Sequence, residues 1–185
     1  IGAEAAARSA PDGYTLLHCP VAVLCVVPQL RKLGWEPRRD LEPVGRLGDL
    51  HCGFVVMNTL GLNTLAEVID YARKNPGKLS YGSAGLGSSS HLRIEMLKLR
   101  TGTDILHVPY RGSADAINDL LSGLVQLMNE IIVLPHVKAG KMKLLCINHE
   151  QRNPEFPDVK TLTELGLPNS DVPIWATIQV PRGTP

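Results

Sequence analysis

A glycine- and serine-rich segment, residues 82–91, contains the groups of this chain that are best suited to hold a ligand. It lies between a short apolar stretch ending at Tyr81 and an expected helix with Leu92, Met96 and Leu99 on its apolar face. A strand–loop–helix junction presents unpaired backbone N–H groups at the positive end of the helix dipole, and serine hydroxyls add further donors. The segment is therefore predicted to bind a carboxylate or a phosphate.

The expected anion site combines donors from this segment with one tyrosine from a second loop. The residues of the segment that are expected to line it are Ser83, Ala84, Gly85, Gly87, Ser88, Ser89 and His91. Tyr110 follows the next expected strand, and because parallel strands end at one edge of their sheet, its hydroxyl is predicted to reach the same site. The neighbouring Arg111 is as consistent with a solvated surface charge as with a ligand contact.

An enzyme that uses residues 82–90 for a nucleotide or a phosphorylated substrate is the alternative to a binding protein. The stretch 85–90 matches only part of the G-x-G-x-x-G pattern, and no acidic residue closes the following strand. Neither Ser83 nor Ser88 stands in the G-x-S-x-G setting of a serine hydrolase. Because no acid or base is placed convincingly beside the loop, no catalysis is expected.

No metal or cofactor site is expected either. The adjacent pairs His18–Cys19 and His51–Cys52 could not both reach one ion from a strand, because neighbouring strand residues point to opposite faces. The four cysteines form no C-x-x-C pair. Free thiols are the favoured interpretation, and two disulfides remain the other possibility.

Composition narrows the class of protein and the class of partner. The chain has 185 residues, 44% of them hydrophobic, and its 19 basic and 18 acidic residues give a net charge of +1. This balance, with only 4% aromatic residues, argues against a nucleic-acid partner. No apolar run approaches the roughly 18 residues of a membrane-spanning helix. No signal peptide is expected within the chain, which begins at Ile1 without Met, a basic stretch or a cleavage site.

Alternating strand and helix signals predict an α/β fold with a largely parallel sheet. Strands are expected at residues 14–18, 54–57, 79–81, 105–108, 125–128, 144–148 and 174–180. Helices are expected over residues 64–74, 113–122 and 134–139, and a further helix follows residue 91 and ends before Gly102. Capping boxes at residues 64–67 and 161–164 and a cap at Ser113 are expected to begin two helices and a helical turn at 161–165. The stretch 21–30 is ambiguous, and residues 31–42 read as a polar loop. The loops after Tyr81, Val108 and Met128 are predicted to share one sheet edge.

Several sequence blocks, taken in order, resemble a known family. They are residues 1–4, 10–17, 74–85, 107–114, 126–128, 135–141, 156–159 and 161–168. In these blocks and their spacing the chain resembles the Bug family of extracytoplasmic solute receptors, the binding proteins of tripartite tricarboxylate transporters. The resemblance runs along essentially all 185 residues.

The resemblance implies a periplasmic binding protein-like (type II) Venus-flytrap fold and a receptor rather than an enzyme. Such a receptor closes on a small organic carboxylate, held by backbone N–H groups, small hydroxyl residues and ordered water, and passes it to membrane transporter subunits. Glu130 would then lie near the floor of the pocket. The family usually has Phe-Asp-Asn where this chain has Asn129-Glu130-Ile131.

The same resemblance implies two α/β domains, of which domain one is incomplete in this chain. Residues 1–53 would form the partial domain one, 54–58 a crossover strand, 59–174 domain two, and 175–185 the return crossover strand. The family's N-terminal strand and carboxylate-binding loop would precede Ile1. An incomplete domain leaves a sheet edge open, so self-association is expected, and a sensing or interaction module outside transport is a further alternative.

Overall fold

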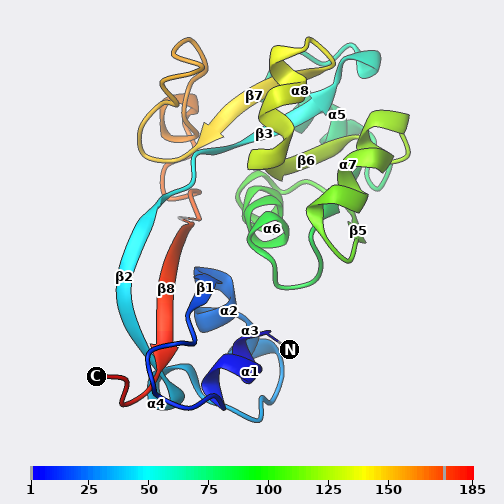
Figure 1. Cartoon of the computed structure of the whole chain (residues 1–185). Coiled ribbons are helices and arrows are strands. Elements are labelled where there is room, and N and C mark those ends of the chain that lie inside the picture. Colours follow the sequence, from blue (N-terminus) through cyan, green and yellow to red (C-terminus); the bar gives the residue numbers. More distant parts are fainter. Residues whose placement is uncertain (1, 173) are drawn as a thin grey trace. The chain divides into compact units, whose positions relative to one another are not determined.

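The structure, a computed structural model, describes residues 2–172 and 174–185 of the chain, which divides into two compact units (Figure 1). The first unit comprises Ile1–Leu50 and Ile174–Pro185, and the second comprises His51–Pro173. The glycine- and serine-rich segment, residues 82–91, belongs wholly to the second unit. Each unit has its own sheet and its own buried core.

The first unit is built on a small antiparallel sheet with short helices beside it. Its elements are α1 (Gly2–Ala7), β1 (Leu17–Pro20), α2 (Val21–Cys25), α3 (Val27–Leu30), α4 (Pro37–Asp40), β2 (Leu41–Asp49) and β8 (Trp175–Pro181). The strand order is β1-β8-β2, with both pairings antiparallel. The expectation of a parallel sheet is wrong for this unit, because β2 and β8 are long strands that pair directly in opposite directions.

Strand β2 was not predicted, and its sequence shows why. Pro43 and two glycines interrupt the alternation of side chains, and the pairing with β8 shifts register after Pro43 and again after Arg46. Leu41 is buried, whereas Val44 and Leu47 are more than half exposed. Because nearly all of β2 is exposed, its sequence lacks the alternating hydrophobic pattern that predicts a strand. Self-association through this unit stays a prediction.

The second unit contains a five-stranded mixed sheet with helices on both faces. Its elements are β3 (Cys52–Met57), η1 (Asn58–Leu60), α5 (Leu65–Lys74), β4 (Ser80–Ser83), α6 (Ser89–Thr101), β5 (Leu106–Pro109), α7 (Ser113–Ser122), β6 (Leu127–Glu130), η2 (Ile131–Val133), α8 (Leu134–Lys138), β7 (Met142–Asn148) and η3 (Thr163–Leu165). The strand order is β5-β4-β6-β3-β7. The pairings of β4 with β5 and β6 are parallel, and those of β3 with β6 and β7 are antiparallel.

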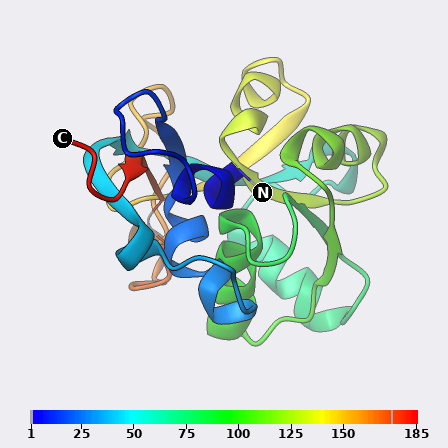
Figure 2. The same ribbon diagram turned by 60° about the horizontal axis from the view of Figure 1, so that its bottom comes forward.

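Two apolar layers enclose this sheet, and Figure 2 shows their helices on its opposite sides. On one side Phe54 of β3 packs in a cluster with Val68 of α5 and Leu97 of α6. On the other side Val55 of β3 packs in a cluster with Leu120 of α7. Every residue of β3 is buried, as expected for a strand covered on both faces. The second unit is therefore a three-layer α/β/α structure.

Helix ends follow local sequence signals in most places. The Thr64 side chain accepts a hydrogen bond from the Glu67 N–H and begins α5, as predicted. Helix α6 ends at Gly102, which adopts a left-handed conformation with φ of 63°. The prediction that Ser113 caps α7 is wrong, because Gly112 occupies the cap position and Ser113 is the first helical residue.

The buried face of α6 differs from the predicted one. Leu99 is 78% exposed, and Leu92 and Met96 are only partly buried. The buried residues of α6 are Ser90, Arg93, Ile94, Leu97 and Thr101. Three of these five are polar, so the hydrophobic pattern pointed to a neighbouring stripe of the helix.

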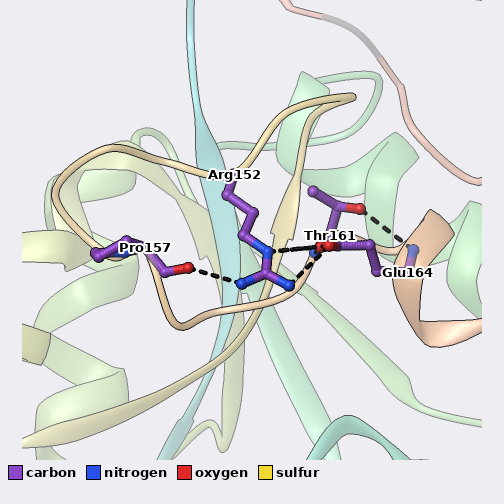
Figure 3. Close-up of polar contacts among 4 residues, drawn as sticks. All are labelled: Arg152, Pro157, Thr161 and Glu164. Atoms are coloured by element: carbon purple, nitrogen blue, oxygen red, sulfur yellow. Dashed lines mark hydrogen bonds and ion pairs between the residues drawn. The ribbon is translucent and has the colours of Figure 1, made fainter.

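The long connection between β7 and β8 is held by a cluster of polar contacts around Arg152 (Figure 3). The Arg152 guanidinium donates to both carboxylate oxygens of Glu164, with its Nη2 2.7 Å from Oε1, and its Nη1 donates to the Pro157 carbonyl at 2.8 Å. Glu164 also accepts from the Thr161 N–H, and the Glu164 N–H donates back to the Thr161 hydroxyl. The predicted capping box is confirmed, but only the short helix η3 follows it.

The structure shows the state of the cysteines and the length of the helices. All four cysteines are free thiols in the structure; Cys19, Cys52 and Cys146 are buried, whereas Cys25 is exposed. Burial raises the pKa of Cys19 to about 11, so this thiol is not a reactive thiolate at neutral pH. None of the described helices is long and apolar enough to cross a membrane.

Candidate functional site

The carboxyl ends of β4, β5 and β6 meet at one edge of the second unit's sheet, as the sequence predicted. Ser83 pairs with Pro109 across β4 and β5, and Gly82 pairs with Met128 across β4 and β6. The loops that follow these strands carry the segment 82–91, Tyr110 and Glu130. Ligands of α/β sheets bind beyond the carboxyl ends of parallel strands, so this edge is the candidate site.

Hydrogen bonds from backbone N–H groups to serine hydroxyls of the same segment hold the first half of the glycine- and serine-rich loop. The Ser83 hydroxyl accepts a hydrogen bond from the Gly85 N–H at 3.1 Å, and the Ser90 hydroxyl accepts one from the Ala84 N–H at 3.2 Å. Ser83 and Ser90 are both buried. These N–H groups and hydroxyls therefore shape the loop, and ligand contact by Ser83, Ala84 and Gly85 stays a prediction.

The second half of the loop is fixed by Ser88 and His91. Ser88 begins α6, and its hydroxyl accepts from the His91 N–H at 3.3 Å. The Gly87 N–H donates to His91 Nδ1 at 3.2 Å, and the Ser88 N–H donates to the Gly85 carbonyl at 3.1 Å. Ser88 is thus a helix cap, a role that the sequence analysis did not assign to it.

The first turn of α6 retains donors that the loop does not use. Within the described residues, the N–H groups of Ser89 and Ser90 have no hydrogen-bond acceptor. Ser89 is partly exposed and Ser90 is buried. Together with the dipole of a 13-residue helix, these unpaired N–H groups are the part of the site best suited to a negative charge.

Tyr110 lies beside the loop, but its hydroxyl proton has a partner within the chain. The Tyr110 hydroxyl donates to the Asp119 carboxylate at 2.7 Å, and the Tyr110 N–H donates to the Ser83 carbonyl at 3.0 Å. Burial, followed by the contact with Asp119, raises the pKa of Tyr110 to about 12. Toward a ligand, Tyr110 can offer ring surface and an oxygen that accepts a hydrogen bond, whereas the sequence analysis expected it to donate.

Two histidine rings and a tyrosine ring stack on one another beside the loop. The His91 and His107 rings stack with their centroids 4.2 Å apart, and the Tyr81 ring stacks on His107 at 4.8 Å. Burial lowers the pKa of both histidines, so each is neutral at pH 7. Glu95 accepts hydrogen bonds from Tyr81 and Lys98, and despite its burial these bonds hold the pKa of its carboxyl low.

Two residues near this sheet edge, Asn129 and Arg93, were not predicted as parts of the site. Asn129 is fully buried and precedes the predicted Glu130, which ends β6 and is partly buried. Asn129 accepts a hydrogen bond from the guanidinium of Arg93, which reaches it from α6. No sequence signal identifies Arg93, because the apolar pattern of α6 does not predict that its position is buried.

The arrangement offers hydrogen-bond donors to an anion. Ser83 lies 2.7 Å from His107 Nε2, and its side chain is fully buried. Among the described residues, no group of three or more His, Cys, Asp or Glu side chains could hold a metal ion. The groups available to a ligand are helix N–H groups, serine hydroxyls and neutral imidazoles.

Comparisons with known proteins agree with this geometry. Protein BugT of Bordetella pertussis is 37% identical over 191 residues, which cover 100% of this chain and 58% of BugT. The structure of an R. palustris protein with adipate has a TM-score of 0.90 and 32% identity and covers 100% of this chain and 63% of that protein. MatC from Rhodopseudomonas palustris with bound malate has a TM-score of 0.87 and 30% identity, with coverage of 100% and 64%.

The chain thus spans a little less than two thirds of the length of each of these proteins. The structural matches confirm the predicted periplasmic binding protein-like α/β fold. The family described as tripartite tricarboxylate transporter family receptor matches residues 1–185, the whole chain. The chain therefore belongs to the receptors of the tripartite tricarboxylate transporter family, as its resemblance to the Bug proteins predicted.

Proposed function

We propose that the protein captures a small organic carboxylate in the periplasm and delivers it to the membrane subunits of a tripartite tricarboxylate-type transporter, without chemical change. The ligand class comprises dicarboxylates, tricarboxylates, acidic amino acids and aromatic acids. Support comes from the receptor family and from the adipate and malate held by two similar proteins.

The single observation that carries this proposal is the start of α6. Ser89 and Ser90 offer backbone N–H groups without acceptors among the described residues, at the positive end of the helix. Ser83, Ala84, Gly85, Gly87, Ser88 and His91 form the loop that holds these groups in place, and Tyr110 and Glu130 flank it. Their contact with the ligand is part of the proposal.

The domain organisation is part of the same proposal. Residues 59–174 would form one receptor domain, entered by the crossover strand 54–58 and left by the return strand 175–185, with residues 1–53 in the other domain. The separation of His51–Pro173 as a compact unit supports this division.

The decisive experiment removes one backbone donor without removing the helix. Ser89 is the first residue of α6 and Ser88 before it is extended, with ψ of 161°, so proline fits at position 89. Ser89→Pro deletes the N–H, whereas the matched control Ser89→Ala deletes only the hydroxyl. Binding of malate, adipate, citrate, glutamate, benzoate and ATP is measured by titration calorimetry.

We expect at least one carboxylate to bind and Ser89→Pro to weaken it at least tenfold, because a hydrogen bond to a charged group contributes about 1.5–3 kcal/mol. Ser89→Ala should change the affinity less. Binding of ATP without binding of any carboxylate would overturn the proposal in favour of the nucleotide-dependent alternative.

A further inference from the structure

Arg93 is a buried cation without a carboxylate partner. Its side chain is 1% exposed, and its polar contacts are with neutral groups: Nε donates to the Val172 carbonyl and Nη1 donates to Asn129 Oδ1, each at 3.0 Å. Nη2 is buried and has no hydrogen-bond partner among the described residues. No aspartate or glutamate oxygen of the described chain lies within salt-bridge distance of it.

The titratable groups around Arg93 do not neutralise it by direct contact. Asp171 is separated from it by two amides, since Asn129 Nδ2 donates to Asn148 Oδ1 at 3.3 Å and Asn148 Nδ2 donates to Asp171 Oδ1 at 3.4 Å. Cys52 lies beside the guanidinium, but burial raises the pKa of this thiol and keeps it neutral. An unpaired charge in a protein interior is costly, so a compensating negative charge is to be expected nearby.

The position of Arg93 places its charge directly behind the candidate anion site. It follows Ser89 by four residues, about 6 Å along the helix axis, and helical side chains lean toward the N-terminus. Its partner Asn129 precedes Glu130 at the edge where β4, β5 and β6 end. At this range a buried charge is screened less by salt and water than a surface charge.

We propose that Arg93 is a specificity-determining residue that makes the carboxylate site select doubly charged acids over singly charged ones. It acts through the field of its buried guanidinium and does not touch the ligand. The inference rests on the proposed function of the same site. A second carboxylate on the ligand adds a second attraction to Arg93, whereas a methyl group in its place adds none.

Two ligands of equal length test this selectivity in the protein. Adipate and hexanoate differ by one carboxylate, and titration calorimetry gives a dissociation constant for each. Arg93→Met removes the charge and Arg93→Lys retains it. Arg100→Met is the matched control, because it removes the same charge from an exposed position of the same helix.

We expect Arg93→Met to weaken adipate binding about tenfold and hexanoate binding only about threefold, since attraction scales with ligand charge. Arg93→Lys should keep most of the preference, and Arg100→Met should leave both affinities nearly unchanged. If Arg93→Met unfolds the protein, Arg93→Gln, which can still bond to Asn129, takes its place.

Equal losses for the two acids in every neutral variant would overturn the inference and make Arg93 a structural residue only. So would an unchanged preference for adipate in a folded neutral variant. If the unaltered protein binds neither these acids nor any other carboxylate, the proposed function itself fails, an outcome distinct from the other two.

Discussion

His107 Nε2 lies 2.7 Å from the hydroxyl of Ser83, inside the unit and beneath the glycine- and serine-rich loop. The neighbouring His91 uses Nδ1 to accept the Gly87 N–H, so its ring proton must be on the other nitrogen. The contact of His91 therefore requires a neutral imidazole. The stacked pair is a structural support of the loop whose strength depends on pH.

The first prediction concerns stability against acid. Burial lowers the pKa of His91 and His107 in the folded protein, with the charge of His91 lowering that of His107 further. Below about pH 6.5 the unfolded chain then binds more protons than the folded chain, so the free energy of unfolding falls as pH falls. Urea unfolding between pH 8 and pH 5 should show this decline.

A double variant tests whether these two histidines cause the decline. His91→Gln with His107→Gln should flatten the pH dependence, whereas His18→Gln, at an exposed position of the other unit, should leave it unchanged. A decline of the same slope in the double variant would assign the effect to other groups.

The second prediction uses the observed orientation of α6. Leu97 is 2% exposed and Leu99 is 78% exposed, although the sequence placed Leu99 on the apolar face. Leu97→Ala should lower the free energy of unfolding by about 2–5 kcal/mol. Leu99→Ala should change it by no more than about 0.5 kcal/mol. Chemical denaturation of the two variants measures the difference, and similar losses would contradict the orientation.

The sequence predicted the elements of the second unit better than their orientation. Thr64, Gly102 and the stretch 54–57 carry strong local signals, namely a cap, a left-handed helix end and a continuous apolar run. The face of α6 could not be predicted, because Arg93 and Thr101 occupy buried positions that an apolar pattern assigns to nonpolar residues. Their burial depends on partners in distant parts of the chain, such as Val172 for Arg93.

The sequence correctly predicted that the loops after β4, β5 and β6 share one sheet edge, whereas the individual contacts of these loops could not be predicted. The spacing of strands and loops is enough to bring Ser83 and Tyr110 together. It does not show that Asp119 binds the Tyr110 hydroxyl, or that Ser90 holds the Ala84 N–H. Such pairings depend on side-chain geometry, which composition and periodicity do not determine.

The third prediction concerns the Arg152–Glu164 pair. Its hydrogen bonds, first from Arg152 and then from the Thr161 N–H, lower the pKa of Glu164 to about 2. The unfolded value is about 4.3, so the stabilising contribution is complete above that pH and is lost as the pH falls toward 2. Arg152→Met, Glu164→Gln and the double variant form a cycle that should show non-additive losses at pH 7. Strict additivity would mean that the pair contributes nothing.

The last prediction concerns the backbone of the loop itself. Gly85 adopts φ of +116°, and a Cβ added there would lie 3.1 Å from the Tyr110 carbonyl oxygen. Gly85→Ala should therefore lower the free energy of unfolding by about 1–3 kcal/mol through backbone strain and should also weaken carboxylate binding, because the loop positions the start of α6.

Gly112→Ala is the matched control, since its backbone is extended and a Cβ there meets nothing within 4 Å. It shares the entropic effect of replacing glycine and should cost less than about 1 kcal/mol. Comparable losses of stability and affinity in the two variants would show that the conformation at Gly85 does not support the site.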